Sequence, residues 1–259
     1  MITLKCFDAK ESSNPNGSRQ SYGNNRYSQS NIDQWLNSQA ASWYSARHSY
    51  DAPPNNANVW NNYSEYDTEA GFLSNFESDF RKAILDAVIR VAKNTVTDGG
   101  GYEDITRKVF LLSNTEVGLS NENGVAEGTL WSYFSSAARR QCYPTAEAVS
   151  NSEYTNSSLN ASSYWYWWLR TPYASYAYFA RYVDAGGSLN SNRAYLGSDG
   201  VRPAFFVESG ITLSVEPDQV ELSTSALLAE FTSKQLVEEV LRRIAEGQED
   251  GDDNEEDDF

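Results

Sequence analysis

The chain has 259 residues, of which 40% are hydrophobic and 22% are charged, and this composition predicts a folded protein with one large domain or two small ones. Its formal net charge is -16, from 20 basic and 36 acidic residues. This balance argues against nucleic acid as a partner, because phosphate binding requires a basic surface.

Cysteine and histidine are too rare to suggest a redox or metal centre. Cys6 and Cys142 cannot make a disulfide framework and do not have the spacing of metal ligands, so we interpret them as buried thiols. The single histidine, His48, is interpreted as a structural or surface residue. No run of 18 apolar residues and no basic, apolar leader is present, so neither membrane insertion nor a signal peptide is expected.

The first periodic element is expected just after residue 30. Ser30 is a suitable N-cap, and Ile32, Trp35 and Leu36 follow with the i, i+3, i+4 spacing of a short amphipathic helix. The dipeptide Pro53–Pro54 breaks both helices and central strands, so the segment around it is expected to be a loop.

The strongest internal helix is predicted over residues 74–94. Its apolar positions recur at helical spacing, at Phe76, Phe80, Ile84, Val88 and Val91. The three glycines of residues 99–101 are expected to form the turn that follows this helix.

The next part of the chain is expected to contain only short elements. Residues 108–113, KVFLLS, predict a buried strand, and residues 144–150, PTAEAVS, predict a short helix that opens at Pro144. Beyond them, brief aromatic or apolar runs alternate with turn sequences such as DAGG and GSDG, which indicates short, irregular strands joined by loops.

A boundary is expected after about residue 213, so residues 1–213 form the first domain and residues 214–259 a linker, a helix and a tail. Thr232 and Gln235 have the spacing of a capping box, and the helix they begin carries one apolar stripe of Leu236, Val240, Leu241 and Ile244. This stripe must be covered by the body of the protein or by a second copy, and in the second case the chain forms a homo-oligomer. Eight acids and no base occupy the last eleven residues, and they predict a disordered acidic tail.

Motifs for catalysis are weak. GGGYED, residues 99–104, lacks the strand and the Lys-Ser/Thr pair of a phosphate-binding loop. Acidic pairs such as Glu116 with Glu122, or Asp51 with Asp67, are common on protein surfaces and need no catalytic role. The chain contains neither a G-x-S-x-G elbow nor an H-E-x-x-H motif, so no enzyme, cofactor or metal is expected.

Several motifs in a fixed order nevertheless resemble a bacterial and phage domain family of unassigned function. The resemblance covers about residues 1–210, and its carboxyl-terminal part is similar to the C-type-lectin-like fold of formylglycine-generating proteins. It implies an α+β, C-type-lectin-like domain with short irregular strands and a few helices. Because neither a signal peptide nor a membrane span is expected, we expect the protein in the cytoplasm or on a phage particle. The motifs are FDAKE (7–11), YGNNRYSQSNIDQWLNS (22–38), WYSARHSYDAPP (43–54), YDTEAGFLSNF (66–76), KVFLLSNTEVGL (108–119), YPTAEAVSNSEY (143–154), WWLRTP (167–172) and GVRPAF (200–205).

Some members of that family are similar to the variable proteins of diversity-generating retroelements, and this likeness implies a diversified region over about residues 164–205. Error-prone copying of template adenines turns AAY codons into codons for Tyr, Ser, Asp, His, Phe, Gly and Ala, but not for Lys, Glu, Gln, Met or Trp. The candidate ligand-binding residues are of the permitted kinds: Tyr164, Tyr166, Tyr173, Ser175, Tyr176, Tyr178, Phe179, Tyr182, Asn190, Ser191, Asn192, Tyr195 and Ser198.

The residue types support a binding surface independently of the genetics. Tyr offers a large, rigid contact area, and Ser, Gly and Asn supply adaptable hydrogen bonds, as in antibody paratopes. The aromatic residues between 173 and 182 do not share one parity, so a single buried strand face cannot hold them all. We expect several of them to reach solvent, whereas Trp165, Trp167 and Trp168 are expected in the core. Arg170 and Arg202 are expected to pair with carboxylates such as Glu116 or Asp199.

The sequence therefore predicts a non-enzymatic protein that binds a protein or a glycan through this surface. Two alternatives on the same fold are weaker. An enzyme of the formylglycine-generating branch is expected to carry two nearby cysteines in its carboxyl-terminal half, where only Cys142 stands. A calcium-dependent lectin is expected to carry a Glu-Pro-Asn or Gln-Pro-Asp loop. EPDQ at residues 216–219 matches neither motif fully and lies outside the region of resemblance.

Overall fold

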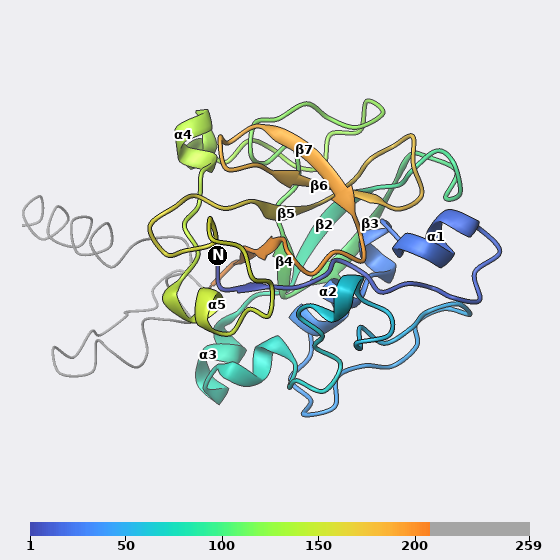
Figure 1. The fold of residues 1–259 in the computed structure, drawn as a ribbon. Coiled ribbons are helices and arrows are strands. Elements are labelled where there is room, and N and C mark those ends of the chain that lie inside the picture. Colours follow the sequence, from blue (N-terminus) through green and yellow to red (C-terminus); the bar gives the residue numbers. More distant parts are fainter. Residues whose placement is uncertain (208–259) are drawn as a thin grey trace, which may run out of the picture. The chain divides into compact units, whose positions relative to one another are not determined.

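The chain divides into two units, Met1–Leu213 and Ser214–Phe259, and the computed structural model describes residues 1–207. The predicted linker, amphipathic helix and acidic tail lie outside the described residues. The described part combines short helices with short strands around a curled sheet, which is an α+β architecture (Figure 1).

The helices are short, and most precede the main strands in the chain. The α-helices are α1 (Gly17–Tyr22), α2 (Asn31–Leu36), α3 (Ser78–Ala83), α4 (Ala137–Arg140) and α5 (Ala146–Ser150). Single 3₁₀ turns occur at η1 (Tyr27–Gln29), η2 (Trp60–Asn62), η3 (Phe72–Asn75) and η4 (Ser132–Phe134). None of the described helices is long and apolar enough to cross a membrane.

The main sheet has five strands in the order β1-β8-β5-β6-β7, in which β8 runs parallel to β5 and the other neighbours are antiparallel. Its strands are β1 (Thr3–Leu4), β5 (Trp167–Pro172), β6 (Phe179–Val183), β7 (Leu189–Arg193) and β8 (Gly200–Val201). Because β1 pairs with β8, the first residues of the chain lie beside the end of the described part. Strands β7, β6 and β5 follow one below another in the upper half of Figure 1.

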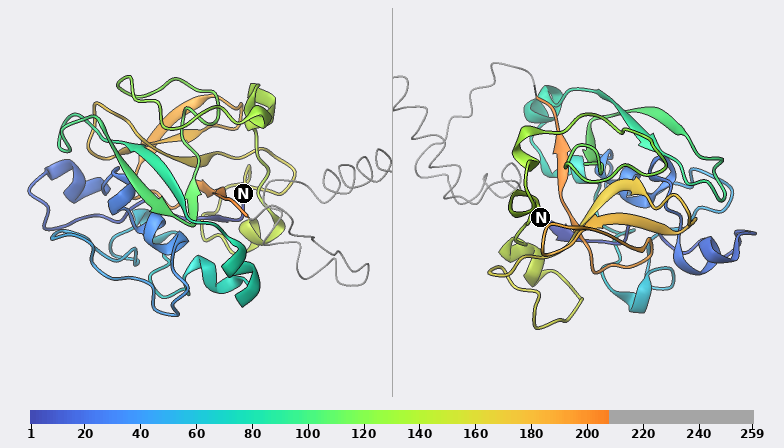
Figure 2. Two further views of the ribbon diagram at one scale, coloured as in Figure 1. Left: turned by 180° about the vertical axis from the view of Figure 1, so that it is seen from behind. Right: turned by 90° about the horizontal axis from the view of Figure 1, so that it is seen from above.

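Two further two-stranded ribbons complete the sheet structure. They are β2 (Ala87–Ala92) with β3 (Tyr102–Arg107), and β4 (Val109–Leu111) with β9 (Pro203–Phe205). In the rear view of Figure 2 the green β2–β3 ribbon lies on the side of the molecule nearer the viewer, and β2 packs against β5 of the main sheet. Glycines 99–101 connect β2 to β3, and all three have a positive φ, a conformation that side chains with a Cβ rarely adopt.

The predicted helix over residues 74–94 is wrong in its second half. The helix α3 ends at Ala83, and Ile84 forms a β-bridge to Val207. Val88 and Val91 belong to β2, where Val88 is 74% exposed while Ile89 and Val91 are buried. The valines matched the helical period by coincidence, since the same segment also has the two-residue alternation of a strand, and pairing with β3 selects the strand.

The other short elements predicted within residues 1–207 are present, although the helix predicted to open at Pro144 begins two residues later. The side chain of Ser30 accepts a hydrogen bond from the amide of Asp33 and caps α2, and β4 is fully buried. The helix α5 begins at Ala146, with Thr145 as its N-cap. Both cysteines are free and buried.

Candidate functional site

The candidate site is built on β5, every residue of which is buried. Trp167 and Trp168 are fully buried, and their indole N–H groups donate to the backbone oxygens of Arg140 and Lys5, at 2.9 Å in each case. Trp165 is also buried. The three tryptophans are therefore core residues, as predicted, and they fix the position of the strands beside them.

Of the two arginines expected to be structural, Arg170 behaves as predicted. Its guanidinium forms a two-pronged ion pair with Glu116, at 2.5 and 2.9 Å, and donates to the backbone oxygens of Leu111 and Glu127. A buried carboxylate and a buried arginine thus satisfy each other. From the sequence, Glu116 and Glu122 are a weak candidate pair for acid–base chemistry. In the structure Glu116 forms an ion pair with Arg170 and Glu122 forms one with Arg181, so both carboxylates have a structural partner.

Arg202 pairs with no carboxylate of residues 1–207, which corrects the sequence prediction. Its guanidinium lies 5.0 Å from the ring centre of Phe134 and 4.9 Å from that of Trp167, and its Nε and Nη1 atoms have no hydrogen-bond partner among the described residues. The side chain of Asp199 instead accepts one hydrogen bond, from Asn192 at 2.9 Å. Burial raises the pKa of Asp199 to about 8.

The connection between β5 and β6, residues 173–178, is termed the display loop. Its alanines point inward, since Ala174 and Ala177 are buried. Its larger side chains point outward: Ser175 and Tyr176 are exposed, and Tyr173 and Tyr178 are half-buried. The expectation that several of these aromatic side chains reach solvent is confirmed.

Residues from other parts of the chain hold the display loop through its backbone. The buried Asn25 donates its Nδ2 hydrogens to the backbone oxygens of Tyr176, at 2.7 Å, and Phe179, at 2.8 Å, with a longer contact of 3.4 Å to Tyr173. The backbone amide of Asn25 donates to the backbone oxygen of Ala177.

Three more residues hold the inward-facing backbone of the loop. Arg19 donates its Nε–H to the oxygen of Ala177 at 3.1 Å, and Thr95 donates both its amide and its hydroxyl to the oxygen of Ala174. Glu122 accepts the amide of Ala174 at 3.0 Å. Since these hydrogen bonds use backbone atoms of the loop, they do not require particular outward side chains.

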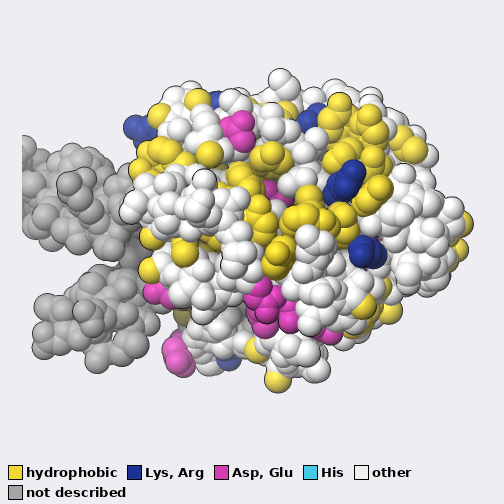
Figure 3. Space-filling model, in the orientation of Figure 1, with side chains coloured by type: hydrophobic (Ala, Val, Ile, Leu, Met, Phe, Trp, Pro, Cys, Tyr) yellow, Lys and Arg dark blue, Asp and Glu magenta, His cyan; other side chains and the backbone are white. Residues whose placement is uncertain are grey.

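The outward rings join into one cluster, which we term the aromatic surface: Tyr22, Tyr173, Tyr176, Tyr178 and Phe179. Neighbouring rings have centroids 4.4 to 5.2 Å apart in the pairs Tyr178–Phe179, Tyr22–Tyr178, Tyr173–Tyr176 and Tyr176–Phe179. Hydrophobic side chains gather over the β5–β6 connection, with basic side chains among them (Figure 3).

Two arginines of the strands lie over rings of the aromatic surface. The guanidinium of Arg181 lies 3.8 Å from the ring centre of Tyr173, and that of Arg193 lies 4.3 Å from that of Tyr22. Sequence reasoning missed Tyr22 and both arginines. Tyr22 is distant in the chain, and no local pattern shows that a cation will lie over a ring.

The remaining candidate residues form a second group or lie apart. The rings of Tyr166 and Tyr182 are 5.7 Å apart, and Tyr182 pairs with Asn190 across β6 and β7. Asn190 is exposed, while Ser191 and Asn192 on β7 are half-buried.

Three candidates do not belong to either group. Tyr164 is exposed and stacks on Tyr143, with ring centres 4.2 Å apart. Tyr195 and Ser198 are each only 6% exposed. These two residues support the site from within and present little surface to a ligand.

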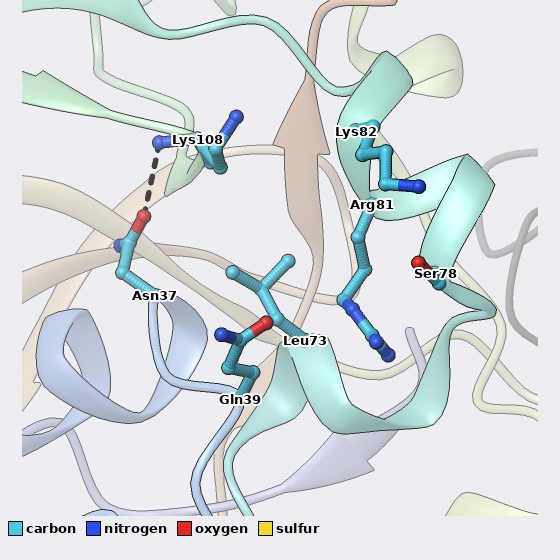
Figure 4. Close-up of a pocket in the computed structure, with 7 residues that line it drawn as sticks. All are labelled: Asn37, Gln39, Leu73, Ser78, Arg81, Lys82 and Lys108. Atoms are coloured by element: carbon cyan, nitrogen blue, oxygen red, sulfur yellow. Dashed lines mark hydrogen bonds between the residues drawn. The ribbon is translucent and has the colours of Figure 1, made fainter.

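Away from the display loop, a pocket of about 460 Å³ beside α3 is lined by residues that include Arg81, Lys82 and Lys108 (Figure 4). Their charged ends point in different directions rather than toward a common point. Lys82 pairs with Asp79, and Lys108 donates to the oxygen of Ile84. Within residues 1–207, no three His, Cys, Asp or Glu side chains are arranged to hold a metal ion.

Comparisons with known proteins give one match. No curated protein and no solved structure matches the chain. Residues 3–209, which include the display loop and all residues that hold it, match the model of a family described as "Domain of unknown function (DUF6273)". Because this match spans most of the 259 residues, the chain belongs to the DUF6273 family.

Proposed function

We propose that the chain is a non-enzymatic binding protein that recognises a protein ligand through the aromatic surface and the adjoining face of β6 and β7. We further propose that its fold is C-type-lectin-like and that it is the variable protein of a diversity-generating retroelement. The single observation that carries the proposal is that different atoms of the display loop hold it in place and face the solvent. Residues outside the loop hold its backbone, through hydrogen bonds that do not involve the outward side chains of the loop.

The composition of the surface favours a protein ligand. Five adjoining aromatic rings with arginines over two of them resemble the residue types that dominate protein-binding hot spots. Tyrosine loses little side-chain entropy on binding, and a loop already fixed by hydrogen bonds loses little backbone entropy. The surface is thus preorganised, which favours affinity.

The separation of roles also suits diversification. Substitution of an outward tyrosine by Ser, Asn, Asp or His leaves every backbone hydrogen bond of the loop in place. Each residue that holds the loop, such as Asn25, Arg19 or Thr95, lies outside the proposed diversified region of residues 164–205. Variation there is therefore expected to change the ligand while preserving the fold.

A display experiment tests the proposal. One library randomises four outward positions of the site, and a control library randomises four exposed positions on another loop; both are selected against purified lysozyme and streptavidin. We expect folded binders from the site library and few from the control. The proposal would be overturned if both libraries gave equal numbers of binders, or if a folded site library gave no binders. The site positions are Ser175, Tyr176, Tyr178 and Asn190, and the control positions are Ser157, Ser158, Ala161 and Ser162.

The genetic part has its own test in the neighbouring DNA. We expect an imperfect repeat of the codons for residues 164–205 that differs almost only at adenines, beside a reverse transcriptase gene. A genomic neighbourhood without such a repeat would remove the retroelement from the proposal and leave the binding surface to the display experiment.

A further inference from the structure

A polar pocket of about 350 Å³ lies beside the display loop and is not part of the aromatic surface. It is formed by the segment that begins α1, by residues 48–50 and by residues 97–98. Arg19 lines it and also donates to the backbone oxygen of Ala177 in the display loop. Of the residues that line this pocket, Pro15 is the only one without a polar side chain.

The pocket carries no net charge. Arg19 and Asp98 form an ion pair at 2.6 Å, and their side chains are only 9% and 5% exposed. Burial lowers the pKa of His48, which keeps its imidazole neutral at neutral pH. An ionic ligand therefore finds no unpaired opposite charge on these three side chains, which favours an uncharged ligand.

Several hydrogen-bonding atoms of the lining have no partner among the described residues. Asn16 caps α1 through its Oδ1 atom, which leaves its Nδ2 group unused. Gln29 accepts from Asn24 through Oε1, which leaves its Nε2 group unused. The Nε2 atom of His48, in contrast, is buried 3.2 Å from Oε1 of Glu11 and is not exposed to the pocket.

These atoms define the chemistry of the ligand. An apolar ligand would remove water from the polar atoms without replacing its hydrogen bonds, at a cost of roughly 1–3 kcal/mol for each group. Neighbouring hydroxyl groups, in contrast, offer donors and acceptors together. Tyr50, which is 39% exposed, adds a ring against which the C–H face of a sugar can pack.

We propose that this pocket binds a neutral saccharide unit, as a second binding site beside the aromatic surface. The site does not depend on the side chains of the display loop. Arg19 lines the pocket and also donates to the backbone of the display loop. A ligand that contacts both the pocket and the loop would therefore bind across a part of the protein that Arg19 and Asp98 hold in place.

Saturation-transfer NMR with D-galactose, D-mannose and N-acetyl-D-glucosamine tests this site on the full chain. We expect at least one of these sugars to bind the parent protein. Ser49→Trp fills the pocket and should weaken that binding at least about tenfold, a loss of about 1.4 kcal/mol. Ser162→Trp, on an exposed loop elsewhere, should bind like the parent.

A second variant with a smaller change tests the pocket even if Ser49→Trp does not fold. Asn16→Asp keeps an oxygen to cap α1 but replaces the unused N–H₂ group with a carboxylate, so it should also weaken sugar binding. Tyr176→Ser should leave sugar binding unchanged, which separates this site from the aromatic surface. The inference is overturned if none of the three sugars binds the parent, or if a folded Ser49→Trp or Asn16→Asp variant binds them as the parent does.

Discussion

Asp199 makes the stability of this protein depend on pH in a way that one substitution can isolate. Its side chain is wholly buried, Oδ2 accepts one hydrogen bond from Asn192, and Oδ1 has no partner among the described residues. Burial raises the pKa to about 8, whereas an aspartate in an unfolded chain titrates near about 3.9. Between these two values the folded protein holds a proton that the unfolded chain has released.

The sign of the effect follows from this difference. A group that binds more protons when folded stabilises the fold at low pH, and this stabilisation is lost as the pH rises from about 4 to about 8. The difference of about four pKa units, at about 1.4 kcal/mol each, gives an upper limit of about 6 kcal/mol. Asp199→Asn keeps the shape and the oxygen that accepts from Asn192, but it cannot ionise.

Urea unfolding at several pH values between 4 and 8 measures the effect. We expect Asp199→Asn to gain stability over the parent as the pH rises, by several kcal/mol at pH 8. The raised pKa values of Glu11 and Asp51 affect both proteins equally, so the difference between the two curves reports Asp199 alone. Asp86→Asn, at an exposed carboxylate, should follow the parent. A constant difference between Asp199→Asn and the parent across this range would refute the reasoning.

Three further variants separately test the surface, the core and the support of the display loop. Tyr176→Ser with Tyr178→Ser should lower the free energy of unfolding by only about 1 kcal/mol apiece, and a collapse of the fold on thermal melting would show that these rings are core. Trp167→Ala should cost about 3–5 kcal/mol because its indole is fully buried, and a parental melting curve would contradict its place in the core. Asn25→Ala should cost about 1–3 kcal/mol and speed amide hydrogen exchange around the display loop, since it leaves backbone oxygens unpaired; Asn190→Ala, at an exposed position, should change neither quantity.

The local features of this fold were predictable from the sequence. Ser30 caps α2, residues 109–111 form a buried strand, and the tryptophans of β5 are core residues. Each of these features depends on a few neighbouring residues, because a cap satisfies the first turn of its own helix and an apolar run marks a buried strand. The mixed parity of the display-loop tyrosines likewise showed that several of them reach the surface.

What only the tertiary structure decided depends on contacts between distant residues. Residues 87–92 fit both a helical and a strand period, and pairing with β3 selected the strand. Arg202 packs against aromatic rings instead of pairing with Asp199. Asn25 is separated from Tyr176 by 151 positions, yet it holds that residue's backbone. Sequence periodicity reports only the environment along one segment, so it cannot show which distant side chain will satisfy the backbone of a loop.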